Sequence, residues 1–261
     1  QAVPATAAPT PLAQAPDPVA TLLARAVDAA RAEAAVRQSG MGALMADIRP
    51  ALSSAALPAN LQAAIRQVLA MALPTDTAPS AAMLKAAIAR SGLFLESHIA
   101  QTPGAAPSDL KGALLVLQQA LVASGAIIGQ RPPRVSTAPP SKGGALAGQA
   151  PRAATARADD IPERLLQVLG EDTEQALARQ TLHQLASLPD ETPGARWMFE
   201  LPLMTPQGAA VAQFAIERDD PGAGSDVAPA WRARFAVDLP PLGPVHVRLR
   251  LHEGRSNAAL W

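Results

Sequence analysis

The sequence predicts an α+β fold built from an all-α region, a proline-rich linker and a C-terminal domain. Apolar residues recur at helical spacing between residues 17 and 126, whereas Pro, Gly and Ser are frequent over 127–160. After residue 195 the period of the apolar residues changes from 3.6 to 2, as in strands. We therefore expect a loose helical region, then a domain in which two helices precede an antiparallel β-sheet.

The N-terminal part is expected to be a disordered tail followed by a small helical bundle. Residues 1–16 mix Pro, Ala and Thr without a period, and Asp17 is a candidate N-cap of the first helix. Ser80 and either Ser108 or Asp109 are candidate caps of later helices. Because only 3% of the chain is aromatic and Ala supplies much of the apolar content, this bundle should pack loosely. The helices predicted in region 17–126 cover residues 17–40, 43–52, 61–72, 81–100 and 110–121.

Residues 127–160 are expected to form a disordered linker. This segment includes QRPPRVSTAPPSKGG, has scattered Arg residues and shows no apolar period. A flexible coil of this length would separate its ends by about 30–35 Å. We therefore expect the helical region and the C-terminal domain to move independently.

The domain at 161–261 should begin with two helices. Asp160 and Glu163 have the spacing of a capping box, and Gly170 is the expected end of the first helix. Apolar residues at helical spacing from Leu177 to Leu185 predict the second helix.

Strict alternation predicts the strands of this domain. The connection LPPLGP, at residues 239–244, separates the two clearest strands, because two prolines cannot donate to a strand ladder. A last strand begins at Ser256 and reaches Trp261, and we expect the domain to be truncated there. The other predicted strands cover residues 197–201, 211–217, 231–238 and 245–252.

No pattern in the sequence predicts catalysis, a metal or a cofactor. The chain has no Cys, and its four His residues lack the i, i+4 pairing and nearby carboxylates of a metal site. No GxSxG, Walker or GxGxxG motif is present. The Asp219–Asp220 pair precedes Pro-Gly, where a solvated turn is favoured over a catalytic dyad. We expect a protein that is not an enzyme and that binds no cofactor.

The charges favour a protein partner over nucleic acid or a membrane. The formal net charge is zero, and no apolar run reaches the length of a membrane span, so we expect no nucleic acid and no membrane insertion. Alternation places four Arg residues on one side of two neighbouring strands, where they could form a positive stripe for an acidic partner. The alternative is that they keep an exposed sheet face soluble. We find no interleaved aromatic residue on that face, as single-stranded nucleic acid would require. The residues of this stripe are Arg232, Arg234, Arg248 and Arg250.

Four motifs of the chain carry a resemblance to a known family. They are LHQLASLPD at 182–190, RWMFELPL at 196–203, FAIERD at 214–219 and, most specifically, DLPPLGPVHVRLRL at 238–251. These motifs resemble the C-terminal domain of flagellar hook-length control proteins. Upstream, SGLFLESHIA and SDLKGALLVL resemble helical segments that precede this domain in some members of the family. The likeness covers about half of the chain.

The resemblance implies a non-enzymatic role in flagellar assembly. Proteins of this family are made in the cytoplasm and exported by the flagellar type III apparatus; they measure the hook and switch export to filament subunits. Their C-terminal domain contacts the cytoplasmic domain of the membrane export-switch protein, and hook and hook-cap subunits are further candidate partners. The positions implicated here are Leu239, Pro240, Leu242, Gly243, Val245 and Val247.

Three other interpretations remain open at this point. The six implicated residues could simply build a hairpin and its core, with partner contact restricted to the loop. The chain could also be a non-enzymatic adaptor that holds one partner with its helical region and another with its sheet. The chain could also be an enzyme with an unrecognised site, and the absence of known catalytic motifs argues against this third possibility.

Overall fold

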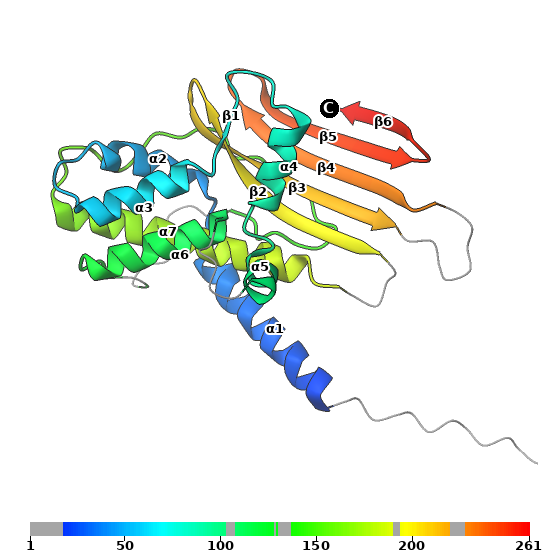
Figure 1. Ribbon diagram of the computed structural model, residues 1–261, viewed down its shortest axis with the longest axis horizontal. Helices are drawn as coiled ribbons and strands as arrows, with labels where there is room; N and C mark the ends of the chain where they lie inside the picture. Colours follow the sequence, from blue (N-terminus) through cyan, green and yellow to red (C-terminus); the bar gives the residue numbers. More distant parts are fainter. Residues whose placement is uncertain (1–17, 103–107, 128, 130–136, 190–193, 220–227) are drawn as a thin grey trace, which may run out of the picture.

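The computed structural model describes residues 18–102, 108–127, 129, 137–189, 194–219 and 228–261, so the predicted tail 1–16 and the cap Asp17 lie outside it. Within these residues the chain forms helices and one six-stranded sheet, and this confirms the α+β class (Figure 1). The helices are α1 (Pro18–Arg37), α2 (Gly42–Leu52), α3 (Ala59–Leu69), α4 (Ala81–Ala89), α5 (Leu95–Gln101), α6 (Leu110–Ala123) and α7 (Pro162–Ala186). The strands are β1 (Leu73–Pro74), β2 (Ala195–Thr205), β3 (Gly208–Asp219), β4 (Ala230–Leu239), β5 (Gly243–His252) and β6 (Arg255–Leu260).

The sheet is an antiparallel meander from β2 to β6, as the alternation predicted. Its strands are hydrogen-bonded in chain order, β1 to β6. The two-residue strand β1 is an addition that the sequence did not indicate, and it pairs in parallel with β2. The period-two pattern therefore located all five long strands, including the last one, which pairs with β5 from Arg255 onward.

The helical region and the C-terminal domain share one hydrophobic core, contrary to the expectation that they move independently. Leu44, Leu61 and Leu114, from α2, α3 and α6, are completely buried in the same cluster as Leu165 of α7 and Val211 of β3. Figure 1 shows α2, α3, α6 and α7 together at one end of the sheet. Because each helix covers an apolar face of the others, the two predicted domains form one structural unit.

Helix α7 is continuous, so the predicted pair of helices in the C-terminal domain is wrong. Gly170, the expected end of the first helix, is buried in the interior of α7. A glycine inside a helix costs about 1 kcal/mol relative to alanine. Complete burial of Leu165, Leu169 and Ala176 on the same helix outweighs that cost, at roughly 1.5–3 kcal/mol for each leucine.

The second half of the predicted linker is an ordered strap, defined here as residues 137–160. Its backbone forms an isolated antiparallel bridge between Gln149 and Val211. The Asp47 carboxylate on α2 accepts hydrogen bonds from the Thr155 hydroxyl at 2.7 Å and from the Ala156 amide at 2.8 Å. The expectation of a disordered linker over 127–160 is therefore wrong for the strap, because polar contacts, rather than an apolar period, hold it in place.

Helix α4 covers one face of the sheet with an aromatic ladder beneath it. Phe199, Phe214 and Phe235 lie directly opposite one another on β2, β3 and β4, and both pairs of ring centroids are 5.2 Å apart. Ala87 of α4 is buried in the same cluster. Stacked aromatic pairs add about 0.5–1.5 kcal/mol beyond their area. This cluster compensates for the small number of aromatic residues by concentrating three of them, Trp197, Phe199 and Phe214, on one face of the sheet.

Other sequence predictions are confirmed locally. Ser80 and Asp109 both cap helices: the Ser80 hydroxyl accepts from the Met83 amide at 3.2 Å, and the Asp109 carboxylate accepts from Gly112 at 2.8 Å. Helix α1 forms as expected, but only its C-terminal half packs on α7. Leu22 is 65% exposed, and Figure 1 shows the start of α1 projecting from the body.

Candidate functional site

The six residues implicated by the family resemblance all lie in the β4–β5 hairpin, but they do not share one surface. Leu239 ends β4 opposite Gly243, whose φ of +77° favours glycine. Between them, Pro240 and Leu242 are exposed at the tip, and Leu242 is the most exposed large apolar residue among those described, at 76%.

Val245 and Val247 point away from any tip surface. They pair with Val237 and Phe235 across the hairpin and lie on the face of the aromatic ladder, where Val247 is 7% exposed. These two valines therefore build the hairpin and its core, as the structural alternative proposed. Only the tip residues Leu239–Gly243 offer side chains for direct partner contact from this motif.

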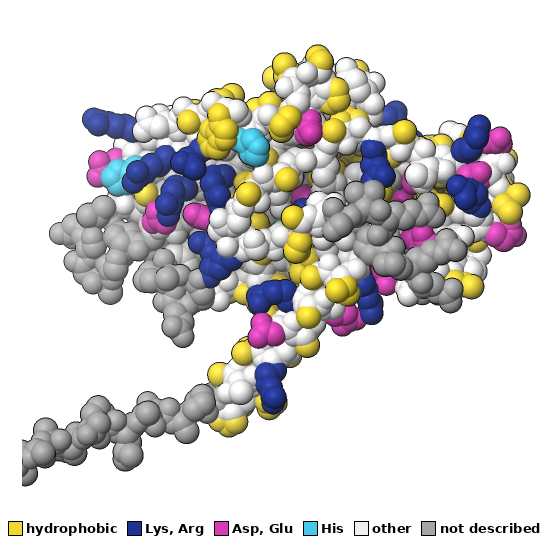
Figure 2. All heavy atoms as spheres, turned by 180° about the vertical axis from the view of Figure 1, so that it is seen from behind, with side chains coloured by type: hydrophobic (Ala, Val, Ile, Leu, Met, Phe, Trp, Pro, Cys, Tyr) yellow, Lys and Arg dark blue, Asp and Glu magenta, His cyan; other side chains and the backbone are white. Residues whose placement is uncertain are grey.

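The four predicted arginines are brought together on the opposite face of the same two strands. Arg232 pairs with Arg250, and Arg234 pairs with Arg248, so both pairs are directly opposite in the register. We call these four residues the Arg face. Opposed residues in antiparallel strands have Cβ atoms about 4.5–5.5 Å apart, and opposed like charges destabilise the pair. Figure 2 shows Lys and Arg side chains gathered on the left, over the end of the sheet that lies on the right in Figure 1.

Carboxylates neutralise only the β4 side of the Arg face. The Arg232 guanidinium lies 2.6 Å from Asp219, and both Arg232 and Arg234 lie within 4 Å of Glu217 on β3. Arg248 and Arg250 are exposed and make no ion pair with any carboxylate that the structure describes. Positive charge therefore remains uncompensated on β5.

An aromatic residue does lie beside the Arg face, which corrects the expectation that none would. The Trp261 ring stacks on His246 with centroids 5.9 Å apart, and the Arg248 guanidinium lies 5.5 Å from the Trp261 ring centroid. The turn at Glu253–Gly254 determines this position of Trp261. Both residues have positive φ, as a two-residue hairpin turn requires, and such a turn sets the register that places Trp261 opposite His246.

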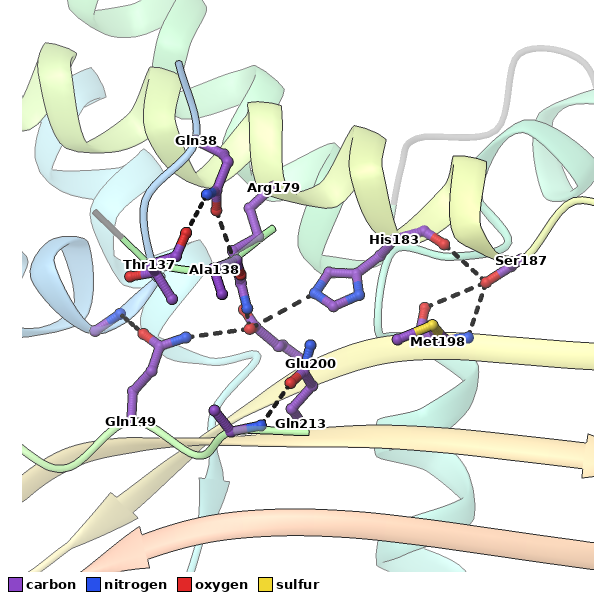
Figure 3. Close-up of polar contacts among 12 residues, drawn as sticks. Gln38, Thr137, Ala138, Gln149, Arg179, His183, Ser187, Met198, Glu200 and Gln213 are labelled. Atoms are coloured by element: carbon purple, nitrogen blue, oxygen red, sulfur yellow. Dashed lines mark hydrogen bonds and ion pairs between the residues drawn. The ribbon is translucent and has the colours of Figure 1, made fainter. Parts of the chain in front are cut away.

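Beneath the same sheet face, α7 and the strap enclose a buried polar cluster that the sequence analysis missed (Figure 3). Arg179 of α7 donates to the Glu200 carboxylate on β2 at 2.6 Å, and both side chains are at most 2% exposed. Arg179 also donates to Gln38 at 2.8 Å and to the carbonyl of Ala138 in the strap at 2.9 Å. Gln149 of the strap donates to Glu200 at 3.1 Å. The cluster therefore connects the residue that follows α1, α7, the strap and the sheet.

The charges of this cluster are set by its own members. Burial would raise the pKa of Glu200, but the adjacent Arg179 and His183 outweigh it and hold that pKa below its usual value. His183 is completely buried, and its Nε2 lies 3.6 Å from the Glu200 carboxylate. This distance exceeds that of a hydrogen bond, and neither ring nitrogen has a hydrogen-bond partner among the described residues. The arrangement is a buried ion pair with a buried His beside it.

A buried pair of carboxyl groups, Asp47 and Asp172, joins α2 to α7. Burial raises the pKa of Asp172 to about 8, and the neighbouring Asp47 carboxylate contributes in the same direction against Arg152. Asp47 itself is 2% exposed and is already engaged with Thr155 of the strap. At neutral pH Asp172 therefore holds a proton that an unfolded chain would have released.

This proton makes stability fall as the pH rises. An unfolded Asp titrates near pH 3.9, whereas folded Asp172 titrates near 8, so the folded state binds the extra proton between these values. We expect Asp172→Asn, which keeps a donor for Asp47, to raise the free energy of unfolding by roughly 1–3 kcal/mol at about pH 9 and to flatten its pH dependence. Urea unfolding at several pH values between about 5 and 9 measures this. Asp159→Asn, at an exposed carboxylate, is the control and should leave the wild-type pH dependence unchanged.

The candidate site lies on the surface of the β4–β5 hairpin. No group of three or more His, Cys, Asp and Glu side chains is arranged to hold a metal ion in the described ranges. Likewise, none of the helices found between residues 18 and 261 is both long and apolar enough to span a bilayer. The tip residues Leu239–Gly243 and the Arg face are the candidate site, and comparisons with protein-family models, curated proteins and solved structures find no match to this chain.

Proposed function

We propose that this chain is a flagellar hook-length control protein that is exported by the flagellar type III apparatus and switches its substrate specificity. The observation that carries this proposal is the β4–β5 hairpin, in which the motif DLPPLGPVHVRLRL forms an exposed apolar tip beside the Arg face, whose β5 arginines have no carboxylate partner among the described residues. A tip and a charged face on one hairpin are suited to reversible contact with another protein. The absence of cysteine and the low aromatic content of 3% favour passage through a channel in an unfolded state.

The partner proposed for the hairpin is the cytoplasmic domain of the flagellar export-switch protein in the membrane. Leu242 would contact that partner through its exposed apolar side chain, and the Arg face would set the orientation of the complex. Hook and hook-cap subunits would be met later, during export. In this proposal the chain works first in the cytoplasm and then inside the growing structure, without catalysing any reaction.

The adaptor interpretation has less support. It requires that the helical region and the sheet hold different partners and move separately. The common core of α2, α3, α6 and α7, together with the strap, makes separate movement unfavourable. A hook-length control protein needs only one binding surface on this unit.

Deleting the gene in the organism that encodes this chain tests the proposal. We expect abnormally long hooks without filaments, measured by electron microscopy of isolated hook–basal bodies. Complementation with Leu242→Glu should fail to restore filaments, because a charge at the exposed tip disrupts an apolar contact without disturbing the fold. The matched control is Val36→Glu, at an equally exposed residue of α1, which should restore both hook length and filaments. Hooks of normal length with normal filaments in the deletion strain would exclude the proposal.

A further inference from the structure

Two of the four arginines of the Arg face, Arg248 and Arg250, have no carboxylate partner among the described residues. Arg248 and Arg250 lie opposite Arg234 and Arg232, so four guanidinium groups occupy two neighbouring rows of the sheet. Glu217 and Asp219 compensate the β4 members only. Opposed arginines destabilise a folded sheet, and an anion bound between them would remove that cost.

The strap and α7 cover the sheet beside the Arg face but not the face itself. The strap approaches as far as β4, where Arg234 donates to the carbonyl of Gly144 at 3.4 Å. Beyond this contact, Arg248 and Arg250 on β5 are exposed, and Figure 2 shows no described segment over the basic side chains at this end of the sheet. The strap therefore borders the Arg face on its β4 side and leaves the β5 side open.

The spacing of the two arginine rows fits an extended peptide. Arg232 and Arg234 are two residues apart on β4, and Arg248 and Arg250 are two apart on β5. A strand rises about 3.3 Å per residue, so the rows are roughly 6.6 Å apart. Acidic side chains at alternate positions of an extended segment have the same spacing, and each carboxylate could accept from one opposed pair of arginines.

The surroundings favour a short acidic peptide over a nucleic acid. Glu217, Asp219 and Asp238 lie on the same side of the sheet as the Arg face, as the register of β3 to β5 shows. These carboxylates border the positive rows and would repel a phosphate backbone that continued past them. A peptide segment with only two or three carboxylates would instead contact the arginines without reaching the bordering carboxylates. We infer that the Arg face binds an extended segment of a protein partner in which Asp or Glu occupies alternate positions.

This inference rests on the proposed function only for the identity of the partner. A binding measurement with purified protein and a synthetic peptide tests it independently of that function. The probe is a fluorescein-labelled ten-residue peptide in which Glu alternates with Thr, and its control has Gln in place of every Glu. Fluorescence anisotropy with the full chain at low salt should show binding of the Glu peptide and little binding of the Gln peptide. Arg248→Gln/Arg250→Gln should weaken binding roughly fivefold to tenfold, as expected for the loss of two exposed charge pairs.

A matched variant and a competitor complete the experiment. Arg31→Gln/Arg157→Gln removes two exposed arginines elsewhere and should leave the dissociation constant unchanged. Equal binding by the Arg248→Gln/Arg250→Gln variant, or equal binding of the Gln peptide, would overturn the inference. Single-stranded DNA that binds the Arg face more tightly than the Glu peptide would also overturn it, in favour of nucleic acid. Peptide binding in a protein whose deletion leaves hooks normal would retain the inference and reject the flagellar function.

Discussion

Replacing Glu200 by Leu is expected to lower the free energy of unfolding by about 3–5 kcal/mol, the largest effect of any single substitution considered for this protein. The substitution leaves the Arg179 guanidinium buried without its carboxylate partner, which now lies at 2.6 Å. A buried charge without a partner is far more costly than the mutual loss of both charges. Urea unfolding followed by circular dichroism measures the difference.

Two further variants distinguish the contribution of the buried ion pair to the free energy of unfolding from that of general packing. Arg179→Met/Glu200→Leu removes both charges, so it should be more stable than Glu200→Leu alone, by a coupling that a double-mutant cycle measures. Asp28→Ala breaks the exposed pair with Arg31 and should change the free energy of unfolding by less than about 0.5 kcal/mol. If Glu200→Leu has an effect as small as Asp28→Ala, the buried pair does not contribute to the fold.

The pH dependence of the free energy of unfolding is a second test of the Arg179–Glu200 pair. Because the pKa of Glu200 is lowered in the folded state, its contribution to stability is present above the unfolded value of about 4.3 and is lost as the pH falls through the folded value. Wild-type protein should therefore lose stability in acid more steeply than Arg179→Met/Glu200→Leu. This window lies below that of Asp172, so the two groups can be distinguished in one series of measurements.

The sheet was predictable because its signal is carried by side chains of clear polarity. Phe199, Phe214 and Phe235 each have a polar residue on one side in the chain, and a register error of one residue would turn each Phe to the opposite face. The two prolines at 240 and 241 also excluded a continuous strand, because neither can donate to a strand ladder. The Arg face followed directly from this alternation.

The buried cluster was not predictable from the same pattern. In the motif RWMFELPL, Glu200 occupies a polar position of an alternating strand, which in most antiparallel sheets faces water. Here α7 and the strap cover that side, and burial of the carboxylate depends on Arg179, 21 residues away in the chain. The only local signal is that Arg179 and His183 are four residues apart and so share a face of α7.

The strap was mistaken for a linker because its composition is typical of disorder and its contacts are not periodic. Residues 137–160 are rich in Ala, Pro and Gly, and few of them bury an apolar side chain. Order comes instead from specific polar partners, such as Gln149 with Glu200 and Asp47 with Thr155. Disorder is predicted from composition by comparing the apolar surface that a segment can bury with the entropy lost on ordering it. Such a comparison does not include polar contacts with residues far away in the chain.

Gly148→Ala tests whether the strap is part of the folded unit. A Cβ atom built on Gly148 would lie 2.4 Å from the Cα of Val237 and 2.5 Å from the amide nitrogen of Asp238, both in the backbone of β4. Backbone atoms in a paired strand cannot move aside as a flexible side chain can, so the strap itself must shift. Overpacking of this kind costs about 1–3 kcal/mol. We expect a loss of that size, because the shift would also weaken the contact of Gln149 with Glu200.

Limited proteolysis distinguishes release of the strap from a general loss of stability. Trypsin should cleave Gly148→Ala faster after Arg152 than it cleaves the wild type, under native conditions and before global unfolding. Ala145→Ser changes an exposed residue of the same segment and should leave both the cleavage rate and the unfolding free energy at wild-type values. A Gly148→Ala protein that matches the wild type in both measurements would show that the strap does not pack on β4. The helical region and the sheet would then be joined by the apolar core alone, and the interpretation of 137–160 as a linker would be restored.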